Sequence, residues 1–225
     1  MLLNPAQRQK LDSGNDREFY SVPRFVTHVD TGFIDQLTSL YRDRLSPNTR
    51  IFDMMSSWVS HLPEEMTFEH IQGHGLNSEE LAKNPRFDQY FVQNLNQELK
   101  LPLADDSFDA VLNTVSVQYL QYPESIFAEI HRILKPNGIA IMSFSNRMFY
   151  HKAIAAWRDE SEANRVELVK GYFQSVVGGS SDKLPGFTQP EVISQIGNVP
   201  DLLRWMGVGG GDPFYAVIAK KITPQ

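Results

Sequence analysis

Apolar residues recur along the chain with two different periods. Over residues 33–45 they recur at i, i+1, i+4, i+7, i+8 and i+12, which predicts a helix with one buried face. Residues 123–135 carry a second stripe of this kind, with Pro123 near its start and Pro136-Asn137-Gly138 after it. Proline near the first turn and glycine past the end are typical helix boundaries. These two segments are therefore the clearest predicted helices.

Between and around these helices lie short apolar runs of strand length. They predict strands at residues 50–53, 68–73, 90–92, 108–114 and 139–144, and a last strand at 214–222. Asn77, with Glu80 three residues later, has the pattern of a capping box and predicts a short helix that ends at Asn84-Pro85. Strands that alternate with helices pair in parallel through right-handed crossovers. We therefore predict an α/β fold with a doubly wound, mostly parallel sheet, helices on both faces and a small helical cap.

The 225 residues suffice for one such domain with an added cap. We expect a flexible N-terminal tail over residues 1–18 and a single domain over residues 19–225. Within it, residues 147–212 are expected to form a variable helical and loop insertion before the last strand, with short helices near residues 190–196 and 200–206. The five residues 207–211, which include four glycines, are expected to form a turn because a strand follows them rather than a helix N-terminus.

Composition narrows the function classes. The net charge of −6 gives no global attraction to phosphate backbones, so no nucleic-acid partner is expected. The chain has no cysteine, which excludes thiol nucleophiles and cysteine-based zinc sites. His70 and His74 are four residues apart on a strand-to-loop segment rather than one helix face, so no metal site is expected. No apolar run reaches 18 residues and no signal peptide is seen, so we expect a cytoplasmic protein with no membrane segment.

Two segments carry a specific resemblance. Leu101-Pro102-Leu103-Ala104-Asp105-Asp106-Ser107-Phe108-Asp109-Ala110-Val111, and then Ile130 to Gly138 with the sequence IHRILKPNG, resemble two successive motifs of the class I S-adenosylmethionine-dependent methyltransferases of type 11. The resemblance covers about residues 30 to 145. It implies a seven-stranded sheet, S-adenosyl-L-methionine as cofactor, and a cofactor cleft at the loops after the first four strands. Ligands of open α/β sheets do lie outside the carboxyl ends of the strands.

The first of these loops departs from the family, which has an acidic residue followed by three alternating glycines. Here the acidic residue is Asp53, and Met55, Ser57 and Val59 stand in place of the glycines. The resemblance assigns Asp53, Met55, Ser56 and Ser57 to cofactor binding. The serine hydroxyls either replace backbone donors to the cofactor or serve as ordinary turn residues.

The other three loops give further candidate residues. Where the family places the acidic residue that binds the ribose, this chain has Gly75, so Asn77 is the candidate there, although helix capping explains this residue better. Asn94 and Leu95 match the adenine loop, and an amide can both accept from and donate to adenine. Asn113 and Thr114 follow the fourth strand and complete the predicted set.

No strong catalytic signature is visible, and methyl transfer mainly requires positioning and, for some acceptors, a base. His151 is a candidate general base and Tyr150 a candidate for orienting the substrate, because both follow the fifth strand. A lone histidine that opens a helix is more often an ordinary surface or capping residue. Tyr20, Arg24 and His28 are expected either to close over the cleft or to pack without a functional role.

The preferred interpretation is a methyltransferase acting on a small molecule. The alternative is a degenerate member that keeps the fold and serves as a binding or regulatory protein, which the missing glycines favour. A nicotinamide-dependent oxidoreductase would need Gly-x-Gly-x-x-Gly after the first strand, and that motif is missing. The methyl acceptor and the oligomeric state are left open.

Overall fold

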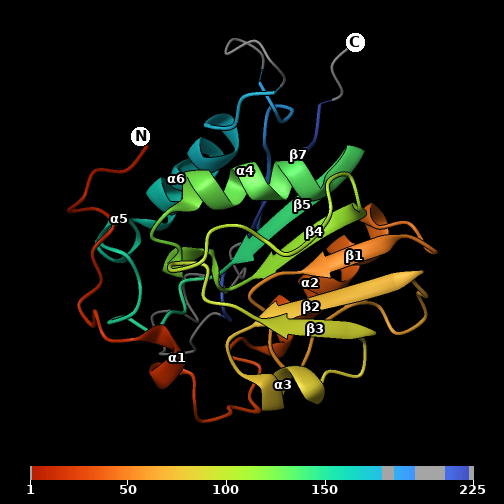
Figure 1. Ribbon diagram of the computed structural model, residues 1–225, viewed down its shortest axis with the longest axis horizontal. Coiled ribbons are helices and arrows are strands. Elements are labelled where there is room, and N and C mark those ends of the chain that lie inside the picture. The colour runs from red at the N-terminus through yellow and green to blue at the C-terminus, as the bar shows by residue number, and fades with distance from the viewer. Residues whose placement is uncertain (1, 179–184, 196–210, 223–225) are drawn as a thin grey trace, which may run out of the picture.

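The computed structural model describes residues 2–178, 185–195 and 211–222, which form a layered α/β domain (Figure 1). The central sheet has seven strands in the order β3-β2-β1-β4-β5-β7-β6. Its strands are β1 Arg50–Asp53, β2 His70–Gly75, β3 Gln89–Val92, β4 Phe108–Thr114, β5 Leu134–Phe144, β6 Glu191–Gln195 and β7 Phe214–Lys220. The helices are α1 Asp16–Phe19, α2 Thr31–Arg44, α3 Ser78–Ala82, α4 Pro123–Ile133, α5 Ala155–Arg158 and α6 Glu162–Gln174, with a 3₁₀ turn at Val117–Tyr119.

The strand order reverses beside β1. β1 pairs in parallel with β2 on one side and with β4 on the other, and β4 pairs in parallel with β5. Only β7 and its edge neighbour β6 run antiparallel to their partners among the strands described. The loops that leave β1 and β4 therefore diverge, which opens a crevice at the carboxyl ends of these strands.

Side chains on the two faces of the sheet belong to separate hydrophobic clusters. Ile51 packs with α2, whereas its neighbour Phe52 packs with the cluster that contains α4 and α6. The same alternation holds in β4, where Leu112 faces α2 and Val111 faces α4. Because successive strand residues point to opposite faces, consecutive apolar residues mark a sheet that is covered on both sides. The predicted doubly wound sheet is confirmed, with α2 behind it and α4 and α6 in front in Figure 1.

Several element bounds differ from the sequence prediction. Residues 190–196 were expected to be helical, but Glu191–Gln195 form the edge strand β6 against β7. The β-branched pair Val192 and Ile193 favours that extended pairing over a helix. The helix α4 ends at Ile133, and β5 begins at once with Leu134. The helix expected over residues 200–206 lies outside the described residues.

Residues 2–18, expected to be a flexible tail, lie against the domain. Leu3 is buried within the cluster that contains α4 and α6. Arg8 is buried too, and it forms an ion pair with Glu124 on α4. Two widely separated segments are thus joined by apolar and ionic contacts, and the N-terminal segment is part of the packed structure. No helix in the described part of the chain is long and apolar enough to cross a membrane.

Candidate functional site

A cavity of about 430 Å³ opens at the carboxyl ends of β1 to β4. Each of these strands contributes to its wall at or just after its last residue: Asp53 from β1, Gly75 from β2, Gln93 after β3 and Thr114 from β4. Clefts of 300–1,000 Å³ that hold one small ligand are typical at this position of an α/β sheet. The cavity therefore coincides with the cleft predicted from the strand order.

The loop after β1 keeps a tight turn without glycine because β2 holds it. Met55 has a φ of 55°, a region that side chains seldom adopt. Its amide donates to Nδ1 of the buried His74, at 3.0 Å, and the amide of Ser56 donates to the carbonyl of His74, at 2.7 Å. These two hydrogen bonds fix the turn in place of the missing glycines.

His74 also reaches the next loop. Its Nδ1 accepts from Met55, so Nε2 carries the hydrogen and donates to the carbonyl of Gln93, at 2.9 Å. Burial lowers the pKa of His74 to about 4, so the ring is neutral near pH 7. One uncharged imidazole therefore ties the loop after β1 to the loop after β3.

Gly75 has no room for the acidic side chain that this position carries in the resembling family. A Cβ placed there would lie 2.5 Å from the carbonyl oxygen of Ser56. The bend of the loop after β1 brings that carbonyl against β2, and only glycine fits the approach. The changes in the two loops are thus parts of one arrangement.

Asp53 is a buried carboxyl in the cavity wall. Burial raises its pKa to about 7, although hydrogen bonds from Ser60 and Ser56 act in the opposite direction. The hydroxyl of Ser56 donates to Oδ2 of Asp53 at 2.9 Å. Asp53 is therefore close to half ionised at neutral pH and would become fully ionised beside a cation.

Glu80, on α3, places a second buried carboxylate in the wall. It accepts from the hydroxyl of Ser57 at 2.5 Å and from the amide of Arg24 at 2.6 Å. We expected it to bond back to its own helix as the second half of a capping box. Instead Asn77 caps the helix, and Glu80 faces the loop after β1.

Asn77 lines the cavity, but its side chain is committed elsewhere. Its Oδ1 accepts from the amides of Glu79 and Glu80, and its Nδ2 donates to the carbonyls of Tyr20 and Ser21. All four hydrogen-bonding positions of the amide are used. The structure thus places Asn77 at the cavity as a cap and as an anchor for the N-terminal segment.

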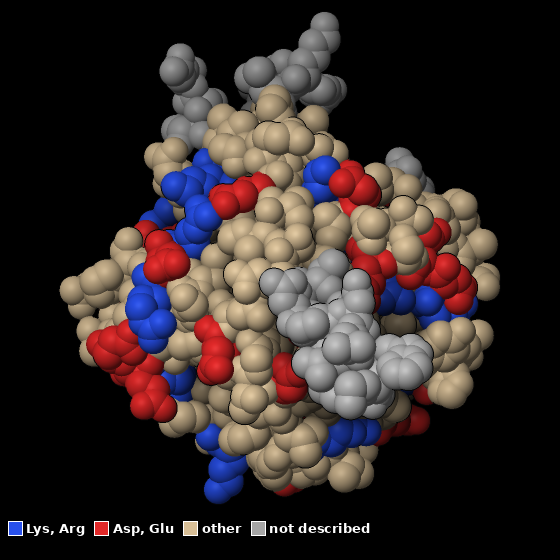
Figure 2. Space-filling view, turned by 180° about the vertical axis from the view of Figure 1, so that it is seen from behind, with Lys and Arg blue, Asp and Glu red and all other residues tan. Residues whose placement is uncertain are grey.

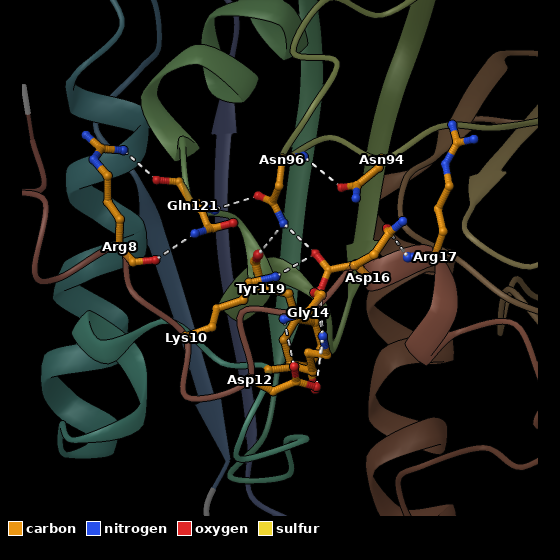
Figure 3. A network of polar contacts seen from close by, with 12 residues as sticks. Arg8, Lys10, Asp12, Gly14, Asp16, Arg17, Asn94, Asn96, Tyr119 and Gln121 are labelled. Carbon is orange, nitrogen blue, oxygen red and sulfur yellow. Dashed lines mark hydrogen bonds and ion pairs between the residues drawn. The ribbon is translucent and has the colours of Figure 1, made fainter.

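The loop after β3 brings Asn94 and Leu95 to the cavity as expected. Asn94 Oδ1 accepts from the amide of Asn96 at 3.0 Å (Figure 3). No described residue accepts from its Nδ2. Asn96 in turn donates to Asp16 at 3.1 Å and to the carbonyl of Tyr119 at 3.0 Å. Asn94 therefore presents amide donors to the cavity from a loop that the N-terminal segment braces.

Of the two predicted residues at the end of β4, only Thr114 lines the cavity. Its hydroxyl lies 3.0 Å from that of Tyr41 and 3.2 Å from that of Ser143. Asn113 lies behind the wall, where its Nδ2 donates to the carbonyl of Met54 at 3.2 Å. Asn113 supports the loop after β1 and has no surface in the cavity.

The N-terminal segment forms the roof of the cavity, to which Lys10, Asp16, Tyr20, Arg24, Val26, Thr27 and His28 contribute. The side chain of Lys152 is 1% exposed, and its Nζ lies 3.0 Å from Asp12 and 3.3 Å from Asp16. Lys10 binds the same Asp16 at 2.8 Å, and Figure 3 shows the resulting network around Asp16. The expected closure by Tyr20, Arg24 and His28 thus rests on buried ion pairs of residues 10–16.

The two candidate catalytic residues lie apart from the cavity. Neither Tyr150 nor His151 is among its lining residues, and both side chains are exposed. Tyr150 packs on Arg158, whose guanidinium carbon lies 5.6 Å from the ring. Their neighbours Phe149 and Lys152 line the cavity instead, so Tyr150 and His151 lie on the solvent side of this loop.

Sequence reasoning missed Glu80, Lys10, Asp16 and Lys152 as lining residues. The capping pattern explained Glu80 without a site, and the N-terminal residues were assigned to a tail. What sets these four residues apart from ordinary surface charges is that their side chains are buried, which the sequence does not reveal. Charged side chains are almost never buried without a partner.

Comparisons with known proteins agree with this geometry. Residues 70–142 match the model of the family described as "Methyltransferase domain". A segment of the biotin biosynthesis bifunctional protein BioHC of Teredinibacter turnerae is 32% identical over 78 residues, covering 32% of this chain and 14% of that protein. An uncharacterized protein of Haemophilus influenzae is 36% identical over 81 residues, 32% of each chain. The chain thus matches less than a third of the length of these relatives.

Solved structures match over most of the chain. An S-adenosylmethionine-dependent methyltransferase from Mesorhizobium loti superposes with a TM-score of 0.52 at 16% identity, covering 81% of this chain and 96% of the other. The [4+2]-cyclase SpnF gives 0.57 at 16% identity, with coverage of 84% and 81%. Phosphoethanolamine N-methyltransferase 2 of Haemonchus contortus gives 0.54 at 15%, with coverage of 84% and 52%. The chain therefore has the fold of the class I S-adenosylmethionine-dependent methyltransferases, and residues 70–142 match their methyltransferase domain family.

Proposed function

We propose that the protein transfers a methyl group from S-adenosyl-L-methionine to a small-molecule acceptor. The observation that carries the proposal is the position of the cavity, at the ends of β1 to β4, together with the family match over residues 70–142. When bound, the cofactor supplies an electrophilic methyl group on a sulfonium. The protein then has to hold two reactants in line and exclude water.

The residues in the cavity wall fit the groups of such a cofactor. Asp53 would become ionised beside a cationic ammonium or sulfonium. The carboxylate of Glu80 has free lone pairs that would accept from a pair of ribose hydroxyls. Glu80 would thereby take the role of the acidic side chain that is missing at Gly75. Asn94 offers an adenine ring amide donors from which no described residue accepts, and Leu95 offers it an apolar surface. The cofactor residues proposed are thus Asp53, Ser56, Ser57, Glu80, Asn94 and Leu95.

Where the acceptor has to lose a proton, we assign that role to His28. It lies in the roof beside Phe149, with 5.4 Å between ring centroids, and no described residue hydrogen-bonds to its side chain. Desolvation lowers the pKa of His28, so the ring is neutral and ready to accept a proton near pH 7.

The charge distribution supports a small acceptor over a nucleic acid. Figure 2 shows the molecule from behind relative to Figure 1. On this face acidic and basic side chains lie beside one another, without a broad basic patch. Many of these groups pair locally, as Arg42 does with Glu65 and Arg44 with Glu191. Such pairing leaves little net field to attract a phosphate backbone.

The degenerate-fold alternative, a binding or regulatory protein without methyl transfer, is favoured by the missing glycines of the loop after β1. A chain of the same fold is described as a [4+2]-cyclase, and a fold by itself does not determine a reaction. Ligand binding separates the two, because a binding protein without cofactor would leave Asp53, Glu80 and Asn94 with no ligand to hold.

The test is calorimetric titration of the purified protein with S-adenosylmethionine and with S-adenosylhomocysteine. We expect micromolar binding, weakened about tenfold in Glu80→Gln, since a hydrogen bond to a charged group contributes roughly 1.5–3 kcal/mol. Glu79→Gln is the matched control, because Glu79 is the exposed neighbour on the same helix. No binding of either compound at millimolar concentration would sink the proposal.

A further inference from the structure

The roof of the cavity carries an exposed apolar surface. Val22 is 68% exposed, Phe25 49% and Val26 55%. Val26 also lines the cavity, so the apolar surface continues from the inside of the cavity to the outside of the protein. These three exposed side chains lie within five residues of one another, and apolar patches that gather on a surface are often binding sites.

Trp58 extends the apolar surroundings of these side chains. Trp58 packs edge-on against Phe25, with 6.3 Å between ring centroids. Its only polar atom is used, because Nε1 donates to the carbonyl of Val26 at 3.2 Å. Trp58 therefore adds an apolar ring beside the mouth of the cavity and fixes the backbone of the roof.

The one formally charged residue between positions 19 and 28 is Arg24, and its charge is withdrawn from this surface. The guanidinium carbon lies 4.7 Å from the centre of the Phe19 ring and 5.5 Å from that of Phe149. Its Nη2 donates to the carbonyl of Phe19 at 2.9 Å. The roof thus presents valine and phenylalanine outward and holds its cation against aromatic rings.

The size of the cavity determines where an acceptor has to lie. About 430 Å³ is near the lower end of the range that holds one drug-sized ligand. A cofactor on Asp53, Glu80 and Asn94 would take the part of the cavity beside the strands. The remaining opening lies under the roof, and it admits a small group rather than a whole second molecule.

We propose that the methyl acceptor is amphiphilic: the group that takes the methyl enters under the roof, and an apolar chain lies outside on Val22, Phe25 and Val26. This inference rests on the proposed function, since it assumes that the cofactor fills the strand side of the cavity. It goes further in naming the class of acceptor and the surface that selects it.

The experiment uses saturated fatty acids of 8, 10 and 12 carbons as probes, below their micellar concentrations, with protein saturated with S-adenosylhomocysteine. Calorimetry should show affinity that rises about fourfold for each added methylene, as expected for burial of one CH₂. Val22→Ser and Phe25→Ser should each flatten this dependence while S-adenosylhomocysteine still binds with unchanged affinity, because neither residue lines the cavity. Val177→Ser is the matched control, because Val177 is 54% exposed and does not line the cavity.

Two results overturn the inference while the proposed function stands. One is that S-adenosylhomocysteine binds, but fatty-acid affinity does not depend on chain length or falls as much in Val177→Ser as in Phe25→Ser. The other is sedimentation that shows a dimer of the wild type and a monomer of Phe25→Ser, since a second copy then covers this surface. Failure of S-adenosylhomocysteine to bind the wild type is a separate result, and it removes the proposed function first.

Discussion

Asp53 combines burial with a place in the cavity wall, and this gives a pH-dependent stability. Its pKa is raised from 3.8 to about 7 in the folded protein, so folding favours the protonated form. The stability it contributes is complete below pH 3.8 and is lost as the pH rises through 7. Between pH 5.5 and 8.5 the wild type should lose roughly 2 kcal/mol relative to Asp53→Asn. Urea denaturation of both proteins at the two pH values measures this, and equal losses would contradict it.

The same carboxyl should couple cofactor binding to protons. A cationic ligand favours ionised Asp53, so below pH 7 binding has to release a proton. Affinity for S-adenosylmethionine should therefore rise with pH up to about 7, by at most about tenfold per unit, and level off above it. Titrations in two buffers of different ionisation enthalpy report the proton released. Asp53→Asn should bind with no such release, and an identical pH profile in that variant would argue against Asp53 as the coupled group.

At individual positions the sequence predicted the site wherever a residue continues a strand into the cleft. Asp53, Asn94, Leu95 and Thr114 all line the cavity as expected, because the strand order alone fixes where strand ends meet. Asn113 was expected in the cavity and lies behind its wall. Successive side chains of a strand point to opposite faces, so Asn113 and its neighbour Thr114 cannot both face the cavity. Glu80 was not predictable, because its partners Ser57 and Arg24 come from loops whose paths the sequence pattern does not specify.

The short helix α3 owes its position to one side chain. Asn77 caps it and also anchors the roof through the carbonyls of Tyr20 and Ser21. Asn77→Ser should keep the cap and lose the anchor, at a cost of about 1–2 kcal/mol for two hydrogen bonds. Hydrogen exchange of residues 20–26 should accelerate while α3 stays protected.

Ser161→Ala is the control at this scale. Ser161 caps α6, and its side chain hydrogen-bonds only to the amide of Asn164 among the described residues. It should lower stability by about 1 kcal/mol without changing exchange in the roof. Faster roof exchange in both variants would show that Asn77 acts through global stability alone.

Among the elements, long periodic segments were the ones predicted well. α2 and α4 were found close to their expected bounds, because one buried face imposes the helical period. Strand β6 was mistaken for a helix, since a five-residue edge strand has little burial to create a pattern. Its identity depends on pairing with β7, which is a contact between segments distant in the chain and not a property of residues 191–195.

Across the whole molecule, the N-terminal segment places a roof over the crevice at the carboxyl ends of the strands. It was expected to be a flexible tail because the start of the chain is polar. In the fold, those charges are what hold it: Arg8 on Glu124, and Lys10 and Lys152 on Asp16. Buried ion pairs of this kind hold one arrangement firmly, because removal of one partner leaves an uncompensated charge.

Lys152→Met tests whether the roof depends on this network. The change removes the partner of Asp12 and one partner of Asp16, and loss of one member of a buried pair typically costs about 3–5 kcal/mol. We expect a loss of that order in denaturant unfolding, faster hydrogen exchange over residues 10–28, and weaker binding of S-adenosylhomocysteine. Lys170→Met is the matched control, because Lys170 pairs with the exposed Glu167 on α6, and such a pair contributes at most about 1 kcal/mol. If both variants lose equal stability and leave exchange at residues 10–28 unchanged, the buried pairs do not hold the roof, and closure of the cavity has to come from the apolar contacts of Leu3 and Phe19 instead.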